Sequence, residues 1–445
     1  MPNVSASNDT ICAIATPPGR GGVGVIRISG PDAFELARRL SARAPEARRF
    51  FLADLRDDQG EVIDQALVLG FRGPASFTGE DVVELQTHGS PVVLEMLLER
   101  LVRLGARRAR PGEFSERAYL NDRMDLAQAE AIADLIAAGT AQAARAASRS
   151  LEGVFSRLVD ALHHDLVELR VWVEAALDFP DEDVDFLADG QVAARLDALR
   201  TRLDELIEQA RAGRLLNDGL RVAIIGKPNA GKSSLLNAMT RRDSAIVTDI
   251  PGTTRDVLRE TIELGGLPVT LADTAGLRDT EDRVEIEGVR RAEREMHAAD
   301  LLFWVVDIED EAAHLPPGLP PELPFIRINN KIDRVGREPR REGRSVDLSA
   351  LEGRGLDLLE QAVREVLGLQ SDGGGEFSAR QRHIDALVKA REPLDRGARE
   401  LAATGSGELL AEELRMAAEA LAEITGRMSS DELLGHIFSS FCIGK

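Results

Sequence analysis

The sequence predicts an α/β domain inserted into an α-helical domain and preceded by a small α+β domain. Residues 1–120 alternate short apolar runs with turns, whereas residues 121–216 are rich in Ala, Leu, Glu and Arg with almost no Gly or Pro. Residues 217–371 alternate strand-like and helical segments, which is typical of a doubly wound parallel sheet. Helical composition returns in residues 372–445, so the α/β segment separates two halves of one helical domain.

The N-terminal region contains two predicted strands and one predicted helix. Residues 23–28 and 66–69 are short apolar runs, which indicates strands. Residues 93–104 carry apolar side chains on one helical face, and Gly105 can end that helix. The candidate site residues of this region are Arg27, Phe77, Thr78, Gly79, Glu80, Asp81 and Glu84. Taken alone, the Thr-Gly-Glu-Asp tetrapeptide fits a charged turn better than a site.

The helical regions are predicted from apolar residues at helical spacing. The expected helices cover residues 127–150, 151–177, 191–212, 380–403 and 407–424. An acidic segment at residues 178–185 is expected to connect two of these helices. The Gly-rich residues 371–376 are expected to form a flexible linker after the α/β domain.

Composition limits the classes of function. The 445 residues include 55 Lys and Arg against 76 Asp and Glu, and the formal net charge of −21 argues against non-specific adhesion to nucleic acid or membranes. It does not exclude a local RNA-binding face. Cys12 and Cys442 cannot form a disulfide scaffold and indicate a reducing compartment. Because the sequence lacks an 18-residue apolar run and residues 1–10 lack signal-peptide features, a cytoplasmic location is expected.

The strongest motif is Gly-Lys-Pro-Asn-Ala-Gly-Lys-Ser at residues 226–233, which fits the P-loop pattern G-x-x-x-x-G-K-[ST]. The apolar run 221–225 predicts a strand before it, and apolar residues spaced through 235–239 predict a helix after it. Such a loop directs backbone N–H groups at phosphates, so the motif predicts a nucleotide site. Lys232 is expected to contact the β- and γ-phosphates, and Ser233 is expected to bind Mg²⁺.

Further motifs select guanine. Asn330-Lys331-Ile332-Asp333 fits N-K-x-D, in which the Asp333 carboxylate accepts from the N1–H and the exocyclic amine of guanine. The stem of Lys331 can lie against the base. Ser349 and Ala350 follow another predicted strand and resemble the supporting base loop. Asp273-Thr274-Ala275-Gly276 fits the D-x-x-G switch, with Asp273 near Mg²⁺ and Gly276 near the γ-phosphate. The sequence therefore predicts a GTPase.

The usual hydrolytic groups are absent from their expected positions. Leu277 follows the switch motif where a water-orienting glutamine often stands, and spacing alone assigns no arginine finger. Another group must orient the water, and another cation must balance the transition-state charge. The acidic candidates in the switch are Asp279, Glu281, Asp282, Glu285 and Glu287.

The motif set resembles the MnmE (TrmE) family of tRNA-modification GTPases over essentially the whole chain. The resemblance rests on the P-loop extended to Ser234, Thr-Asp-Ile-Pro-Gly-Thr-Thr-Arg-Asp at 248–256, Asp-Thr-Ala-Gly-Leu-Arg at 273–278, Leu-Asn-Asp-Arg-Met-Asp-Leu-Ala-Gln-Ala-Glu-Ala at 120–131, and the terminal Phe-Cys-Ile-Gly-Lys at 441–445. The G motifs alone would allow several GTPases. The terminal motif and the domain order single out this family, whose fold is a P-loop GTPase domain inserted in a helical domain after a tetrahydrofolate-binding-like domain.

The resemblance implies a K⁺-activated GTPase whose G domains dimerise. The positions matching its K⁺ ligands are Asn229, Thr248, Ile250 and Thr253, and those matching its Mg²⁺ ligands are Ser233 and Thr254. K⁺ would replace the missing arginine finger, and Glu285 matches the glutamate that acts on the attacking water through a second water. The full set of implied nucleotide contacts is Asn229, Ala230, Gly231, Lys232, Ser233, Ser234, Thr248, Asp249, Ile250, Pro251, Gly252, Thr253, Thr254, Asp273, Thr274, Ala275, Gly276, Asn330, Lys331, Asp333, Ser349 and Ala350.

The resemblance also implies that the N-terminal domain forms a constitutive homodimer and binds a formyl-tetrahydrofolate-type one-carbon donor. The matching positions are Arg27, Glu84, Arg123 and Lys445. The cations suit the glutamate carboxylates of folate, and Glu84 can accept from the pterin N–H groups. Arg123 stands where lysine is often found, which keeps the charge but changes its geometry. Cys442 is open to two interpretations, a nucleophile or a thiol near the folate pocket without covalent chemistry.

The implied reaction needs a flavoprotein partner of the MnmG (GidA) type. Together the two proteins add an aminomethyl or carboxymethylaminomethyl group at carbon 5 of the wobble uridine in certain tRNAs. The main alternative is a ribosome-assembly GTPase of the Era or Der type that binds rRNA and shares the P-loop and N-K-x-D motifs. A folate-binding module without GTPase activity would leave the G motifs without a purpose.

Overall fold

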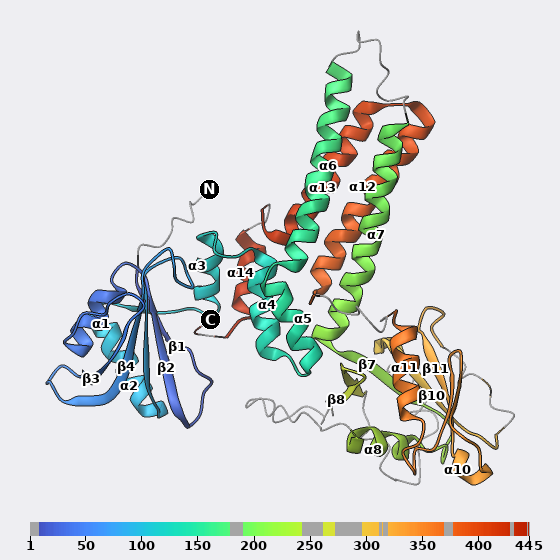
Figure 1. Ribbon diagram of the computed structural model, residues 1–445, viewed down its shortest axis with the longest axis horizontal. Coiled ribbons are helices and arrows are strands. Elements are labelled where there is room, and N and C mark those ends of the chain that lie inside the picture. The colour runs from blue at the N-terminus through green and yellow to red at the C-terminus, as the bar shows by residue number, and fades with distance from the viewer. Residues whose placement is uncertain are drawn as a thin grey trace. The chain divides into compact units, whose positions relative to one another are not determined.

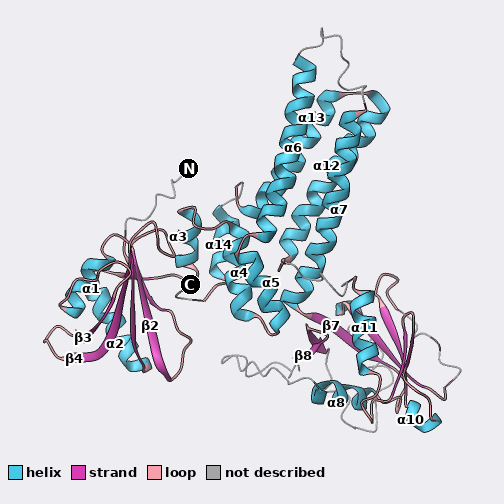
Figure 2. Ribbon diagram, in the orientation of Figure 1, coloured by secondary structure: helices cyan, strands magenta, loops and turns pink. Residues whose placement is uncertain are grey.

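A computed structural model describes residues 9–178, 190–242, 261–271, 296–310, 314, 319–368, 377–427, 431–442 and 444. Contacts divide the chain into two compact units. The first unit combines Met1–Ala133 with Thr425–Lys445, and the second is Asp134–Ile424. Figure 1 shows their helices and strands coloured along the chain, and Figure 2 separates helices from strands by colour. In the described residues, no helix is sufficiently long and apolar to cross a membrane.

The first unit is built on a mostly antiparallel sheet of order β3-β4-β5-β2-β1-β6, in which only the β1–β6 pair is parallel. Its strands are β1 (Ile11–Ile14), β2 (Gly21–Ser29), β3 (Phe50–Arg56), β4 (Val62–Phe71), β5 (Val82–Gly89) and β6 (Arg107–Arg108). The strands predicted at 23–28 and 66–69 are confirmed as β2 and β4. Strands β1, β3, β5 and β6 were not predicted.

Two helices cover one face of this sheet, α1 (Ala33–Ser41) and α2 (Pro91–Leu104). The predicted helix at 93–104 is confirmed as α2, which begins two residues earlier because Pro91 has the φ angle of a first helical residue. Gly105 ends it in the left-handed conformation, and its N–H donates to the last carbonyl groups of the helix. Ile26 and Leu85 pack beneath the two helices in a buried core, so the alternate residues of β2 and β5 face the other side of the sheet.

The C-terminal residues pack within the first unit. Helix α3 (Glu113–Leu120) contacts α14 (Asp431–Ser439), and Leu126, from the start of α4 (Leu126–Ala137), joins Phe438 and Phe441 in an apolar cluster. The N–H of Gly112 donates to the Cys442 carbonyl oxygen at 3.4 Å. The amino-acid composition does not predict that α14 packs with the first unit, because its residues favour a helix just as those of the preceding helices do.

The second unit contains a bundle of long helices (Figure 1). Its helices are α5 (Ala141–Leu151), α6 (Val154–Asp178), α7 (Gln191–Asp218), α12 (Gln381–Thr404) and α13 (Gly407–Thr425). The helix predicted over 127–150 is instead divided into α4 and α5. Thr140 interrupts it because its extended backbone and its side chain, which accepts from the N–H of Ala143 at 3.1 Å, begin a new helix.

Residues after the α/β domain pack against helices that precede it in the sequence. The Ser378 N–H donates to the hydroxyl oxygen of Ser150 at 2.9 Å, and the Arg380 guanidinium lies 2.6 Å from the Asp134 carboxylate. Phe377 stacks on Phe155 with ring centroids 4.7 Å apart. These contacts fix the chain where it returns from the α/β domain, so that domain is an insertion as predicted.

The α/β domain has a sheet of order β12-β13-β11-β10-β7-β9-β8. Its strands are β7 (Leu220–Ile225), β8 (Thr261–Leu264), β9 (Leu267–Leu271), β10 (Leu301–Asp307), β11 (Phe325–Asn330), β12 (Arg340–Glu342) and β13 (Ser345–Leu348). All neighbours are parallel except the edge pairs β8–β9 and β12–β13. The strands predicted at 221–225, 267–272, 301–307 and 325–328 are confirmed, while the antiparallel edges were not predicted.

The described helices of this domain are α8 (Lys232–Arg242), α10 (Ile332–Val335) and α11 (Leu356–Val366). Helix α7 leads into β7 (Figure 2). In the sheet order, β7 lies between β9 and β10. The chain continues from β7 towards one edge of the sheet through β9 and towards the other through β10. Ligands of open α/β sheets bind at such a reversal, beyond the carboxyl ends of the strands.

Candidate functional site

The P-loop at residues 226–233 joins β7 to α8 at the predicted position. Two of its glycines are required by close approach of other groups. A Cβ atom on Gly226 would lie 2.2 Å from the Val305 carbonyl oxygen. One on Gly231 would lie 2.0 Å from the side-chain nitrogen of Asn330. Both distances are far inside van der Waals contact, so a larger residue at either position would displace the loop.

Lys232 folds back over the loop that precedes it. Its ammonium donates to the carbonyl oxygens of Gly226 at 2.8 Å and Lys227 at 3.0 Å. Burial lowers the pKa of Lys232, because desolvation disfavours the charged form. A phosphate at the N-terminus of α8 would give this ammonium a negative partner. Ser233 and Ser234 are exposed at the same end of the helix.

Asn330 connects the P-loop to the base loop. Its side chain is buried, and its amide nitrogen donates to the Ala230 carbonyl oxygen at 2.9 Å. Its amide oxygen accepts from the N–H of Ala350 at 3.0 Å. One side chain therefore holds three of the predicted nucleotide motifs in one arrangement. Loss of this side chain would leave a buried donor and a buried acceptor without partners.

The residues predicted to read guanine lie at the carboxyl ends of β11 and β13. Ser349 donates its hydroxyl to one oxygen of the Asp333 carboxylate at 2.5 Å, which fixes the orientation of that carboxylate. Lys331 has a positive φ of 71°, an uncommon conformation for a residue other than glycine. Asn229 of the P-loop also has a positive φ, at 63°, and is exposed. Backbone strain of this kind concentrates at ligand-binding loops.

A hollow of about 520 Å³ lies beside the P-loop. It is lined by residues 227–230 of the loop, residues 304–307 of β10, and Glu309, Asp310 and His314. The Lys227 ammonium lies 2.6 Å from the Asp310 carboxylate. The carboxyl end of β10 thus places carboxylates next to a cation of the phosphate-binding loop.

In the first unit, two residues predicted to bind the one-carbon donor lie next to each other. Arg27 on β2 and Glu84 on β5 are direct cross-strand partners, and their charged groups lie 3.0 Å apart. Both lie on the face of the sheet away from α1 and α2, and each side chain is 21% exposed. The guanidinium of Arg27 also lies 5.0 Å from the ring centroid of Phe77 and 5.7 Å from that of Phe114. The ion pair is therefore partly accessible, and its guanidinium lies near two phenylalanine rings.

Arg123 lies beside the loop that contains Phe77. A Cβ atom on Gly79 would be 3.2 Å from the Arg123 Cγ atom, so the arginine stem packs against this loop. Thr78 and Glu80 bond inward to Ser29, with both distances 2.7 Å. These bonds make the Thr-Gly-Glu-Asp segment a structured support between Arg27 and Arg123.

Comparison with known proteins identifies the family. The MnmE helical domain model matches residues 126–442, and the model of the GTP-binding protein TrmE N-terminus matches residues 10–123. Over 99% of both chains, the sequence is 55% identical to the tRNA modification GTPase MnmE of Stutzerimonas stutzeri. The corresponding protein of Chromohalobacter salexigens is 53% identical over 98% of both chains. The chain belongs to the MnmE family of tRNA modification GTPases.

Membership of the MnmE family confirms the predicted resemblance and the GTPase assignment. The ribosome-assembly GTPases of the Era and Der type are therefore set aside as the family of this chain. A more distant similarity, to the FeoB G-domain of Methanococcus jannaschii, has 21% identity and a TM-score of 0.24, and covers 34% of this chain and 98% of that one. That similarity is too weak to support an argument.

Several predicted site residues of this MnmE-family chain lie outside the described residues. They are Thr248, Asp249, Ile250, Pro251, Gly252, Thr253, Thr254, Asp273, Thr274, Ala275, Gly276, Glu285 and Lys445. The remaining acidic candidates of the switch lie outside as well. The described part of the nucleotide site therefore consists of the P-loop, the N-K-x-D segment and the base loop.

Two charged residues at the sites were not predicted from the sequence. Asp307 ends β10 and forms an ion pair with Lys331 at 2.6 Å. Arg117 is nearly buried and contacts Glu80 at 3.1 Å and Glu113 at 3.3 Å. A carboxylate directly after an apolar strand could have indicated Asp307. The local signal for Arg117 was its i,i+4 spacing from Glu113, whereas Glu80 is 37 residues away in sequence.

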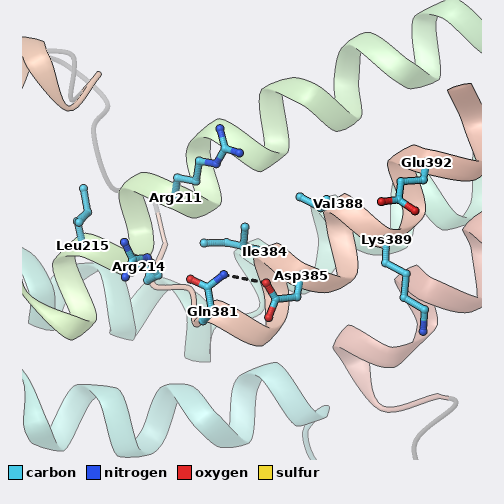
Figure 3. A pocket seen from close by; sticks show the side chains of 9 residues that line it. All are labelled: Arg211, Arg214, Leu215, Gln381, Ile384, Asp385, Val388, Lys389 and Glu392. Atoms are coloured by element: carbon cyan, nitrogen blue, oxygen red, sulfur yellow. Dashed lines mark hydrogen bonds between the residues drawn. The ribbon is translucent and has the colours of Figure 1, made fainter. Parts of the chain in front are cut away.

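Another hollow, of about 550 Å³, lies between α7 and α12 of the helical region (Figure 3). The basic side chains that line it are Arg211, Arg214 and Lys389, and the acidic ones are Asp385 and Glu392. The side-chain amide of Gln381 donates to Asp385 at 2.8 Å along one wall. None of the residues predicted for GTP or the one-carbon donor lines this hollow.

Proposed function

We propose that this MnmE-family chain is a K⁺-activated GTPase that acts with an MnmG (GidA)-type flavoprotein. The pair would add an aminomethyl or carboxymethylaminomethyl group to carbon 5 of the wobble uridine in certain tRNAs, in the cytoplasm. One observation carries the proposal. The chain matches an MnmE protein over 99% of its length and contains both the nucleotide-binding motifs and the Arg27–Glu84 pair. GTP hydrolysis would drive a conformational change and would not form the new bond.

The P-loop, the N-K-x-D segment and the base loop each have a proposed role in nucleotide binding. The P-loop and the N-terminus of α8 would surround the phosphates, with Lys232 beside the β- and γ-phosphates and Ser233 as a ligand of Mg²⁺. Asp333, oriented by Ser349, would accept from guanine. In hydrolysis water attacks the γ-phosphorus, the bond to the β-phosphate oxygen breaks, and GDP and phosphate leave. We assign the orientation of that water to Glu285, as in the family pattern.

The exposed end of the P-loop suits a monovalent cation. Asn229 is exposed and its backbone is left-handed, so its side-chain oxygen is available to an oxygen-seeking cation beside the phosphates. We propose that K⁺ is held there together with Thr248, Ile250 and Thr253, with closure of two G domains completing the site. Bound K⁺ would supply the positive charge that an arginine finger supplies in other GTPases.

The Arg27–Glu84 pair fits a folate-type donor. A guanidinium has five N–H donors, so Arg27 can donate to Glu84 and still donate to an oxygen atom of a bound folate. The half-buried ring of Phe77 beside this pair suits a flat pterin ring. We propose that Arg123 and Lys445 complete this site, and that a homodimer forms through the N-terminal domains. The Cys442 side chain is exposed. Whether it acts as a nucleophile or lies near the folate pocket without covalent chemistry stays open.

The net charge bears on how tRNA is bound. Phosphate contacts require Lys and Arg, whereas this chain carries a formal charge of −21. We propose that the flavoprotein partner supplies much of the affinity for tRNA. Tight, salt-sensitive binding of tRNA to the isolated protein would contradict this division of roles.

The one-carbon site is tested by Glu84→Gln. The change keeps the size of the side chain and removes a charged acceptor, so we expect 5-formyltetrahydrofolate to bind about 10- to 100-fold more weakly in calorimetric titration. Transfer of labelled carbon to tRNA should fall in the reconstituted system with the flavoprotein, while GTP turnover stays unchanged.

The matched control for this experiment is Glu35→Gln. Glu35 forms an exposed ion pair with Arg38 on α1 and faces neither site, so its removal should leave donor affinity unchanged. Wild-type affinity in Glu84→Gln would remove the donor from this ion pair and with it the one-carbon part of the proposal.

A further inference from the structure

Asp307, at the carboxyl end of β10, belongs to none of the nucleotide motifs. Its carboxylate lies 2.6 Å from the ammonium of Lys331, and both side chains are 24% exposed. The strands bring the two residues together, because Asp307 is the register partner of Asn330 and the N–H of Ile308 donates to the Asn330 carbonyl oxygen at 2.9 Å. Asp307 thus lies one residue across the sheet from the lysine of N-K-x-D.

The carboxylate of Asp307 is held from both sides. One oxygen contacts Lys331, and the other accepts from the N–H of Glu309 at 3.2 Å. The hydrogen bond from Lys331 is the first cause that keeps the pKa of Asp307 below its usual value, so the carboxylate is ionised at neutral pH. Arg334 is the other nearby cation, at 3.9 Å, but its side chain is 55% exposed.

The backbone and side chain of Lys331 are both held in one conformation. Lys331 has a left-handed φ of 71°, a backbone conformation that residues other than glycine rarely adopt. A free lysine side chain samples many rotamers, and ordering it opposes binding. The ion pair with Asp307 removes that freedom before a nucleotide arrives.

We propose that Asp307 is a positioning residue for guanine nucleotides, acting through Lys331. By holding the ammonium, Asp307 keeps the aliphatic stem of Lys331 in place as one wall of the base site. The proposal rests on the proposed contact between Lys331 and the base. Because the stem contacts the flat face of the base, Asp307 supports binding of any purine, whereas Asp333 discriminates between purines by their edges.

The test is a titration of fluorescent GDP against Asp307→Ala, Lys331→Ala and the double variant of the full-length protein. We expect Asp307→Ala to weaken binding about tenfold. The double variant should bind no more weakly than Lys331→Ala, because Asp307 acts through that lysine. In an Asp333→Asn background, which should accept xanthine, adding Asp307→Ala should weaken binding of fluorescent XDP by the same factor as Asp307→Ala weakens binding of GDP in the wild type.

Two further variants separate positioning from loss of structure. Asp307→Asn keeps the shape of the side chain and should give an intermediate loss. Glu365→Ala breaks the ion pair between Glu365 and Arg341 in the same domain, away from the nucleotide loops, and should bind as wild type does. Thermal unfolding of each variant shows that the domain remains folded.

Each contrary result has a distinct meaning. Wild-type GDP affinity in Asp307→Ala, or losses that multiply in the double variant, would overturn the positioning role while leaving the base site intact. Wild-type affinity in Lys331→Ala would instead show that the lysine does not contact the base. In that case the proposed base site is wrong, and the role of Asp307 falls with it.

Discussion

Asp333→Asn is expected to lower GTP affinity by about 10³-fold or more and to create preference for XTP. In the proposed base site the Asp333 carboxylate would accept from both the N1–H and the amine of guanine, whereas an asparagine would present an N–H₂ group to the amine. Xanthine carries a carbonyl oxygen in place of that amine, so the new amide can donate to it. Ser349 can still donate to the asparagine oxygen, which keeps the side chain oriented.

The measurement for Asp333→Asn is turnover of GTP and XTP at a series of nucleotide concentrations. The matched control is Asp357→Asn, an identical change at an exposed position in the first turn of α11. This control should retain wild-type preference. If Asp333→Asn still preferred GTP, another residue would read the base and the N-K-x-D assignment would be wrong.

Asn330→Ala is expected to cost both nucleotide affinity and stability. The change leaves the Ala230 carbonyl and the Ala350 N–H without their partner in a buried place. At about 1–3 kcal/mol for each unpaired group, the free energy of unfolding should fall by roughly 2–6 kcal/mol. GDP affinity should fall by about 10²-fold or more, because the P-loop and the base loop lose their common anchor.

The neighbouring Asn329 provides a control for that experiment. Its amide donates to Asp347 at 2.7 Å and to Ser345 at 3.1 Å, on β13 and away from the nucleotide loops. Asn329→Ala should therefore lower stability, measured by urea denaturation, but leave GDP affinity close to wild type. Equal losses of GDP affinity in the two variants would show that Asn330 acts through general stability alone.

The sequence predicted the parts of the molecule in which local pattern and function coincide. The strand at 221–225, the P-loop at 226–233 and the helix after it follow from apolar spacing and glycine placement, and the structure contains all three. The strand at 301–307 was recognisable because it is buried on both faces and reads as a continuous apolar run. The strand at 325–328 was recognisable from isoleucines at alternate positions, which are its buried residues.

Other features depend on contacts between distant residues and gave no local signal. Strand β5 is an exception, because buried residues alternate with more exposed polar ones from Val83 to His88 and this pattern of period two indicates a strand. The pairing of Arg27 with Glu84 depends on sheet register over a separation of 57 residues. Asp307 and Lys331 likewise meet only because β10 and β11 are parallel neighbours.

The central claim is that this MnmE-family GTPase uses K⁺ in place of an arginine finger. It is tested most directly by GTP turnover in K⁺ and in Na⁺ at equal ionic strength, for the wild type and for Asn229→Ala. We expect K⁺ to stimulate the wild type by about 10³-fold, in line with other charge-supplying groups in GTPases, and the stimulation to be lost in the variant. Equal turnover of the wild-type protein in the two salts would contradict the K⁺ mechanism and require another cation beside the phosphates.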